Sequence, residues 1–213
     1  MEIIELSQDI DEKTQVFPGS PNLKILKWSN FDINGYDSEL IFTSTHVGTH
    51  IDSPAHFCNN GIPVDRIPLS KLIVFNKTKI LGIKKKNSNI IEINDLKGFD
   101  INNNDTILID TGWSSNRFNE NYFKDSPGLS KQAAEYLSEL QINLVGIDSP
   151  NIDPATDENF SAHKVLSAKS IPIIENLINL DKIRGINDFV FIALPLRLKG
   201  CSGSPVRAIA VIK

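Results

Sequence analysis

The most informative stretch of the sequence is Thr45-His46-Val47-Gly48-Thr49-His50-Ile51-Asp52-Ser53-Pro54-Ala55-His56-Phe57. It places three of the chain's four histidines within eleven residues, with a carboxylate among them. On a straight strand His46 and His50 would lie about 13 Å apart, which is too far for two imidazoles to bind one ion at about 2.1 Å each. Gly48 permits a bend in the chain that brings the two imidazoles close enough to share an ion. His50 and Asp52 lie two positions apart and therefore share one face of an extended segment.

A metal site is the function that this spacing predicts. Pro54 ends regular strand pairing, so we expect the chain to turn there and to bring His56 toward the same site. Two histidines and one carboxylate leave coordination positions open, which is typical of catalytic rather than structural metal sites. Imidazole and carboxylate ligands suit zinc, manganese or ferrous iron, and the sequence does not choose among them. The alternative is that these histidines form ordinary hydrogen bonds.

The elements around this stretch predict an α/β fold with a large mixed β-sheet and a few packed helices. Short apolar runs bounded by Gly, Pro, Asn or Asp are typical of strands. These runs are Ile3–Leu6, Leu23–Lys27, Glu39–Val47, Leu72–Phe75, Thr78–Ile83, Thr106–Asp110, Leu144–Ile147, Ile171–Ile174, Phe189–Leu194 and Val206–Ile212. The clearest helix follows Pro127-Gly128, with Ser130 as its N-cap, and shorter helices are expected over Ser161–Ala168 and Leu177–Ile183. We expect residues 1–213 to form a single domain, because no linker or repeat interrupts them.

Composition excludes several classes of function. The net charge of −4 argues against a nucleic-acid surface, and the basic run Lys84-Lys85-Lys86 lacks the aromatic residues of such a surface. No stretch approaches the ~20 apolar residues of a membrane helix, and the N-terminus lacks a signal-peptide pattern, so we expect a cytoplasmic protein. Two cysteines, Cys58 and Cys201, are too few for a disulfide framework.

The histidine segment also resembles the signature His-x-Gly-Thr-His-x-Asp-x-Pro-x-His of the cyclase-like metal hydrolases, which include bacterial kynurenine formamidases and isatin hydrolases. Further segments that resemble the family's pattern occur in the family's order along nearly the whole chain. They are Leu6-Ser7, Phe17-Pro18-Gly19-Ser20-Pro21, Asp110-Thr111-Gly112-Trp113, Gly146-Ile147-Asp148-Ser149-Pro150, Ala162-His163-Lys164, Ile173-Ile174-Glu175-Asn176-Leu177 and Gly203-Ser204-Pro205-Val206-Arg207. The resemblance implies a cyclase-like swivelling β/β/α fold.

The resemblance also implies the roles of the site residues. His46, His50 and Asp52 are expected to bind one metal ion, and Asp52 to bridge to a second ion held by His163 and Glu175. His56 is expected to be the acid/base catalyst rather than a ligand. From the residues alone His163 attracts notice because it is the one histidine outside the segment. Nothing in the residues themselves distinguishes Glu175 from a carboxylate on the surface.

A small amide is the substrate that the resemblance implies. The expected reaction is hydrolysis of an aryl formamide such as N-formylkynurenine, in a homodimer or larger homo-oligomer. A lactam or lactone hydrolase, and a metal-binding protein without turnover, remain as alternatives. Among the aromatic residues Phe17, beside a Pro-Gly turn, and Phe57, beside the motif, are the candidate substrate-binding residues, ahead of Trp28 and Trp113.

Three further residues have open roles in the sequence. Cys58 is expected to be a small buried residue, although a thiolate ligand is an alternative. Asp148, like Asp153, is expected to serve in a turn or cap, with a supporting place near the site as the alternative for Asp148. Arg207 is expected to pair with a carboxylate, in the core or at a subunit contact.

Overall fold

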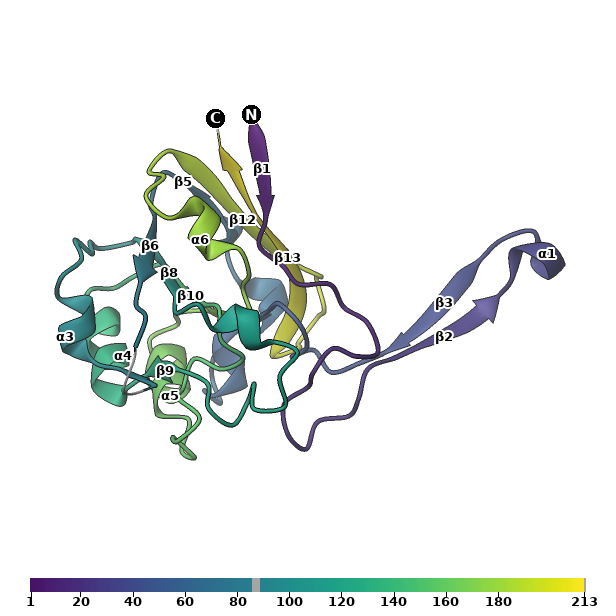
Figure 1. Ribbon diagram of the computed structural model, residues 1–213, viewed down its shortest axis with the longest axis horizontal. Coiled ribbons are helices and arrows are strands. Elements are labelled where there is room, and N and C mark those ends of the chain that lie inside the picture. The colour runs from purple at the N-terminus through teal and green to yellow at the C-terminus, as the bar shows by residue number, and fades with distance from the viewer. Residues whose placement is uncertain (86–88, 213) are drawn as a thin grey trace.

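One mixed β-sheet organises the structure, a computed structural model that describes residues 1–85 and 89–212 (Figure 1). Within these residues it has nine strands in the order β5-β12-β13-β4-β11-β10-β8-β6, with β1 paired to β13. The strands are β1 Glu2–Glu5, β4 His50–Asp52, β5 Ile73–Phe75, β6 Thr78–Gly82, β8 Thr106–Asp110, β10 Leu144–Ile147, β11 Ile173–Glu175, β12 Phe189–Pro195 and β13 Gly203–Ile212. The expected α/β class with a large mixed sheet is confirmed.

One half of the sheet is parallel. Strands β6, β8, β10 and β11 run in the same direction, and every residue of β8 and β10 is buried. Strands buried on both faces have continuous apolar sequences, as the runs at Thr106–Asp110 and Leu144–Ile147 do. Parallel neighbours require crossover connections, and these contain α4 (Lys131–Glu139) and α5 (Ser161–Ala168).

The other half is antiparallel and is joined to the first by the short strand β4. Strand β4 pairs antiparallel with β11 on one side and with β13 on the other. In this register His50 lies opposite Glu175 and Asp52 lies opposite Gly203. The sheet therefore brings the histidine segment together with residues from the second half of the chain.

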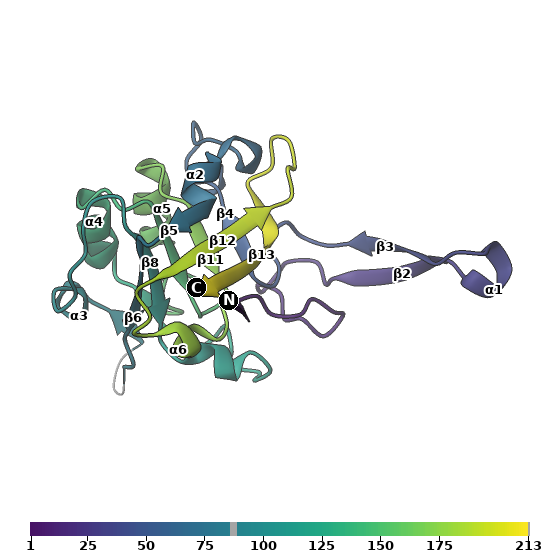
Figure 2. The same cartoon turned by 90° about the horizontal axis from the view of Figure 1, so that it is seen from above.

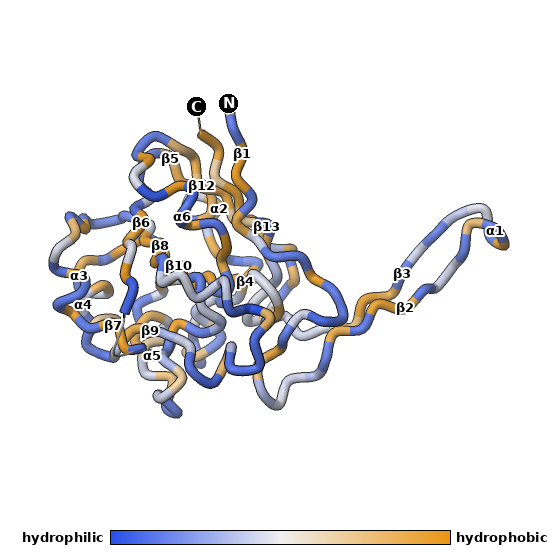
Figure 3. The backbone as a smooth tube through the Cα atoms, viewed as in Figure 1, coloured by the Kyte–Doolittle hydropathy of each residue, from blue (hydrophilic) through white to orange (hydrophobic). Residues whose placement is uncertain are grey.

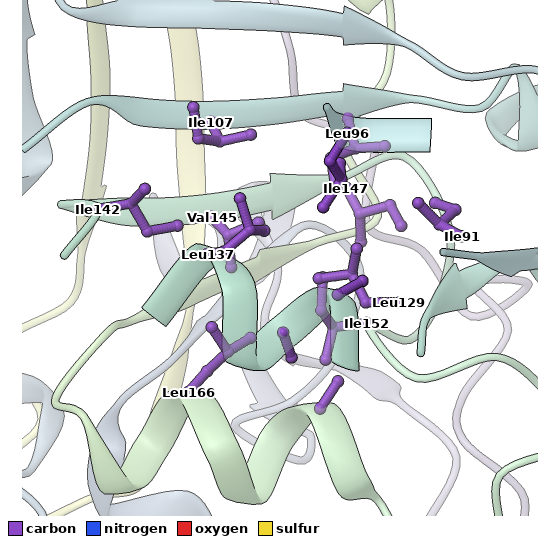
Figure 4. Close-up of a cluster of buried hydrophobic side chains, with 14 of the residues drawn as sticks. Ile91, Leu96, Ile107, Leu129, Leu137, Ile142, Val145, Ile147, Ile152 and Leu166 are labelled. Atoms are coloured by element: carbon purple, nitrogen blue, oxygen red, sulfur yellow. The ribbon is translucent and has the colours of Figure 1, made fainter. Parts of the chain in front are cut away.

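Helices cover one face of the parallel half and enclose an apolar core there (Figure 4). Ser130 caps α4 as expected, since its Oγ accepts a hydrogen bond from the backbone N of Ala133 at 3.2 Å. Leu137 of α4 packs in one cluster with Ile147 of β10 and Leu166 of α5, all completely buried. The short helix α3 (Ile93–Leu96) adds to the same cluster.

Replacing Leu137 with Ala should lower the free energy of unfolding by about 2–5 kcal/mol, because the substitution leaves a cavity in this core. Urea denaturation of the purified protein measures the change. Glu135→Ala is the matched control on the outer face of the same helix, where 46% of the Glu135 side chain is exposed. An equal loss in both variants would contradict the buried packing of Leu137.

A second apolar cluster fills the space beside the antiparallel half. It includes Leu6, Ile51, Phe189 and Phe191, which are completely or almost completely buried. The helices α2 (Leu69–Leu72) and α6 (Leu180–Ile183) contribute Leu72 and Leu180 to this cluster. The core around the histidine segment is thus apolar and continuous with the main sheet.

A hairpin extends far from the body of the molecule, as Figures 1 and 2 show. It consists of β2 (Lys24–Ser29) and β3 (Ser38–Phe42), with the short helix α1 (Phe31–Asn34) at its tip. The hydropathy colouring in Figure 3 shows apolar stretches along both strands. We call residues 24–42 the arm. The remaining small elements are the strands β7 (Ile90–Ile91) and β9 (Gly128–Leu129) and three 3-10 turns, at Pro54–His56, Val64–Arg66 and Trp113–Asn116.

Most predicted strands differ from the structure by one to three residues at their ends. For two predicted elements the hydrogen bonds explain the difference. The strand expected over Glu39–Val47 ends at Phe42, because Phe42 pairs with Lys24, the first residue of β2, and β3 has no partner beyond it. The helix expected over Leu177–Ile183 begins at Leu180. Leu177 and Ile178 instead donate backbone hydrogen bonds to Ile147 and Leu6.

Two expectations concern surfaces. No helix among the described residues is long and apolar enough to cross a membrane. In the basic run, Lys84 is exposed and Lys85 Nζ lies 2.6 Å from Asp95 Oδ2, while Lys86 is outside the described residues.

Candidate active site

The bend in the histidine segment brings three side chains together. Gly48 has φ +58°, in the left-handed region, and turns the chain between His46 and His50. His46 Nδ1 lies 2.6 Å from Asp52 Oδ1, and His50 Nε2 lies 3.3 Å from the same oxygen. We call His46, His50 and Asp52 the first cluster.

A second cluster shares Asp52 with the first. His163 projects from α5 and Glu175 ends β11. His163 Nε2 lies 3.0 Å from Asp52 Oδ2 and 3.2 Å from Glu175 Oε1. One oxygen of Asp52 therefore faces the first cluster and the other faces the second cluster, which consists of Asp52, His163 and Glu175.

Each histidine of the two clusters is held through its far ring nitrogen. The partners are Ser202 Oγ at 2.9 Å for His46 Nε2, Gly48 O at 2.9 Å for His50 Nδ1 and Asp153 Oδ2 at 2.5 Å for His163 Nδ1. Such contacts fix the ring orientation and leave the near nitrogen free to bind a cation, an arrangement typical of metal-binding histidines.

Buried negative charge makes this site attractive to cations. Asp52 and Glu175 are 2% and 4% exposed, and their ion-pair partners among the described residues are histidines rather than Lys or Arg. Burial opposes protonation of His50, but Asp52 and Glu175 outweigh it and raise its pKa to about 9. The pKa of His163 is likewise raised by Asp153, Asp52 and Glu175 against the effect of burial.

A divalent metal ion fits these residues. A buried carboxylate needs a compensating charge, and the clusters meet that need only by protonating imidazoles. The set of three imidazoles and two carboxylates suits zinc, manganese or iron. Both clusters keep their ligand atoms within 4.8 Å of one another, close enough for one ion each.

His56 differs from the other three histidines. It ends the 3-10 turn that begins at Pro54, and its ring stacks on His46 with centroids 3.9 Å apart. Neither of its ring nitrogens has a hydrogen-bond partner among the described residues, and it belongs to neither cluster. Burial lowers its pKa to about 4, so the imidazole is neutral at pH 7 and able to accept a proton.

A cavity of about 210 Å³ opens onto both clusters. Phe17 and Phe57, the two candidate substrate-binding residues, both line it. Phe123 and Phe160 complete the aromatic wall, with the Phe57 and Phe160 ring centroids 5.2 Å apart. Trp28 and Trp113 do not line it: Trp28 lies in the arm, and Trp113 Nε1 donates to a backbone carbonyl at 3.0 Å.

The remaining open roles fall into place around the site. Asp148 accepts hydrogen bonds from the backbone N and Oγ1 of Thr111, a residue far from it in the sequence, and not from the local turn that was expected. Cys58 is only partly buried and belongs to neither cluster. Arg207 Nη2 lies 2.7 Å from Glu5 Oε2 on the surface, not in the core.

Sequence reasoning missed four residues around the site. Asp153 was expected to be a cap, and it does accept from the backbone N of Ala162, but it also holds His163. Ser202, Phe123 and Phe160 carried no signal of their own. Ser202 and Asp153 lie next to segments that match the family's pattern, which was the one available indication.

Replacing Gly203 with Ala should weaken metal binding and activity by about 10–100-fold, the loss expected when the partner of a metal ligand is disturbed. A Cβ there would lie 2.5 Å from His46 Cε1 and 2.8 Å from Ile51 O, so the His46 ring must move. Metal titration and kcat/KM measure the change. Gly98→Ala is the control, since its Cβ would meet nothing within 4 Å. Unchanged metal affinity would contradict the placement of His46.

Comparison with known proteins identifies the family. The model of the family described as putative cyclase matches residues 4–154. The chain belongs to this family. A kynurenine formamidase of Geobacillus thermodenitrificans is 35% identical over 206 residues, which cover 96% of this chain and 95% of that protein.

Solved structures agree with the cyclase-like fold. Isatin hydrolase A from Labrenzia aggregata superposes with a TM-score of 0.89 at 24% identity, over 99% of this chain and 93% of that one. A structure described as a predicted metal-dependent hydrolase from Bacillus stearothermophilus has a TM-score of 0.78 and 26% identity, over 100% and 98% of the two chains. The expected cyclase-like fold is confirmed. The full-length similarity to a kynurenine formamidase shows that the chain is an enzyme of the amidohydrolase type.

Proposed function

We propose that this cyclase-family enzyme hydrolyses an aryl formamide, N-formylkynurenine, to kynurenine and formate. The observation that carries the proposal is the cavity in which four phenylalanine rings line the approach to both clusters and to the unbonded His56. An aryl group suits such a wall because aromatic rings pack favourably on one another. The full-length similarity to a kynurenine formamidase supports the same substrate.

We assign the residues as follows. His46, His50 and Asp52 would hold one divalent ion, and Asp52 with His163 and Glu175 would hold a second. Zinc or manganese suits these nitrogen and oxygen ligands. Asp52 would serve both sites, which is supported by its two oxygens facing different clusters. Phe17 and Phe57 contact the aryl group.

A bound divalent ion supplies hydroxide at neutral pH, because it lowers the pKa of water to about 7. The protein's own residues do the rest. The aromatic wall orients the aryl ring so that the formyl carbon faces the clusters. A C–O bond forms at that carbon, and His56 takes the proton of the added hydroxyl group. As the C–N bond breaks, His56 delivers that proton to the departing aniline nitrogen. Imidazole suits this step because a ring nitrogen can accept a proton from one group and return it to another.

The test is turnover of N-formylkynurenine by protein loaded with zinc or manganese, before and after chelation. We expect formate release that disappears on chelation and returns with added metal. Turnover of a lactam or lactone alone would favour the second candidate, which the structural similarity to isatin hydrolase A supports. Full metal content without any turnover would indicate a metal-binding protein that is not an enzyme.

We also propose that the enzyme is a homodimer in which the arm contacts a second copy. Large apolar side chains along the arm are exposed, including Trp28 at 71% and Ile33 at 84%. Exposed apolar patches of this kind mark interaction sites. Ser20 and Ser44, which flank the arm in sequence, line the cavity. Analytical ultracentrifugation should find a dimer, and a monomeric wild-type protein would contradict the proposal.

A further inference from the structure

A buried pair, Tyr122 and Asn176, borders the site without a role in the reaction described above. Tyr122 is 2% exposed and Asn176 is 6% exposed. Tyr122 Oη donates a hydrogen bond to Asn176 Oδ1 at 2.8 Å. Burial raises the pKa of Tyr122, so the phenol keeps its proton and remains a donor at neutral pH. In the structure Asn176 presents Oδ1 to this hydroxyl group, which leaves its amide nitrogen free to interact elsewhere.

The backbone of Asn176 is also held by hydrogen bonds. Its N donates to Ser149 O at 2.9 Å, and its O accepts from Thr49 Oγ1 at 2.6 Å. Its φ is +60°, a left-handed conformation that asparagine adopts more readily than most residues. Thr49 precedes His50 of β4, and Asn176 follows Glu175 of β11. The hydrogen bonds of Asn176 therefore fix its position relative to both strands that carry cluster residues.

The amide nitrogen of Asn176 remains available as a hydrogen-bond donor. Nδ2 has no hydrogen-bond partner among the described residues. Among the described residues, Thr78 Oγ1 is the one fully buried side-chain N or O atom that lacks a hydrogen-bond partner. Because Asn176 Nδ2 lacks a partner too but is not such an atom, it is not fully buried. Nδ2 is therefore open to solvent, and Asn176 lines the cavity beside Glu175 and His50.

We propose that Asn176 Nδ2 donates a hydrogen bond to the carbonyl oxygen of the scissile amide, and that Tyr122 is the positioning residue that aims it. The inference rests on the proposed amide hydrolysis. When hydroxide adds to the carbonyl carbon, the π electron pair moves to the oxygen, which becomes negatively charged. A fixed neutral donor stabilises that charge without reorganising. The pair returns to re-form the carbonyl as the C–N bond breaks, and Asn176 keeps its protons throughout.

The first experiment removes the donor from the metal-loaded enzyme. Asn176→Asp keeps an oxygen acceptor for Tyr122, and Asn176→Gly suits the positive φ and adds no charge. We expect kcat to fall about 10²–10³-fold in both, the loss found when one such donor is removed, with KM nearly unchanged because the interaction forms in the transition state. Asn151→Asp adds the same charge to the cavity wall and should lose far less. Metal content should stay close to wild type in both variants, and thermal unfolding should stay close to wild type in Asn176→Asp, which keeps the acceptor.

The second experiment tests whether Tyr122 acts through Asn176. Tyr122→Phe should lower kcat in the wild-type background and have no further effect in the Asn176→Gly background, because the amide that it aims is then gone. A purely structural role would lower kcat by the same factor in both backgrounds and would overturn the assignment of Tyr122.

Other outcomes separate this inference from the proposed function. Wild-type kcat in both Asn176 variants would overturn the inference, and so would a raised KM with unchanged kcat. If the wild-type enzyme does not hydrolyse N-formylkynurenine but hydrolyses another amide or a lactam, the substrate proposal fails. The role of Asn176 is then tested by the kcat of the same variants with that substrate. A wild-type enzyme that hydrolyses no amide would overturn both.

Discussion

Replacing Asp52 with Asn should deprive the enzyme of bound metal and lower kcat/KM by about a thousandfold or more, equivalent to ~4 kcal/mol of lost transition-state stabilisation. The expected effect is large because Asp52 contacts all three histidines of the two clusters, at 2.6 Å for His46, 3.3 Å for His50 and 3.0 Å for His163. An amide keeps the shape of the side chain but removes the negative charge shared by both clusters. Neither cluster then keeps enough charge to hold a divalent ion.

Elemental analysis after dialysis and steady-state kinetics measure the two effects. Asp105→Asn is the matched control, because Asp105 is also buried and charged but pairs with Lys79, at 3.2 Å. We expect that variant to lose stability while it keeps its metal and its kcat. An Asp52→Asn enzyme with a full complement of metal would show that the ion is held without the shared carboxylate.

The histidine segment could be interpreted from sequence because its geometry is local. The bend at Gly48, the shared face of His50 and Asp52 and the turn at Pro54 all follow from conformational preferences of neighbouring residues. The structure has each of them, with φ +58° at Gly48 and a 3-10 turn that begins at Pro54. Local chemistry therefore sufficed for half of the site.

The other half depends on strand pairing that no local pattern reveals. Glu175 lies beside His50 because β11 pairs with β4, and one residue of slip would turn its side chain to the other face of the sheet. From the residues alone Glu175 was one carboxylate among many. The resemblance to a family singled it out, and the register gives the physical reason for its place in the second cluster.

Residues with two roles were the hardest to predict. Asp153 was expected to serve in a turn or cap, and it does accept a hydrogen bond from the backbone N of Ala162 in the first turn of α5, but the same carboxylate holds His163 Nδ1 at 2.5 Å. Asn176 follows a strand and has the conformation typical of a turn residue, while its amide borders the cavity. The first role explains the residue fully at the level of sequence, so nothing there indicates the second.

Replacing His56 with Ala should leave the metal in place and lower kcat by about 10²–10⁴-fold, the usual contribution of a general acid or base. The variant should keep its metal because His56 belongs to neither cluster, and its ring nitrogens have no partner among the described residues. The loss of kcat follows because no other neutral imidazole at the site is free to pass a proton to the leaving nitrogen. His56 alone is not engaged at both ring nitrogens.

His46→Ala is the control that gives this prediction its force. The two rings stack with centroids 3.9 Å apart, so the two variants remove the same side chain from almost the same place. His46 Nδ1 faces Asp52 while Ser202 holds Nε2, so its loss should release metal as well as activity. Metal analysis of the pair therefore separates a ligand from a proton carrier. If His56→Ala also released the metal, His56 would be a ligand, and the proton would have to reach the leaving nitrogen by another group.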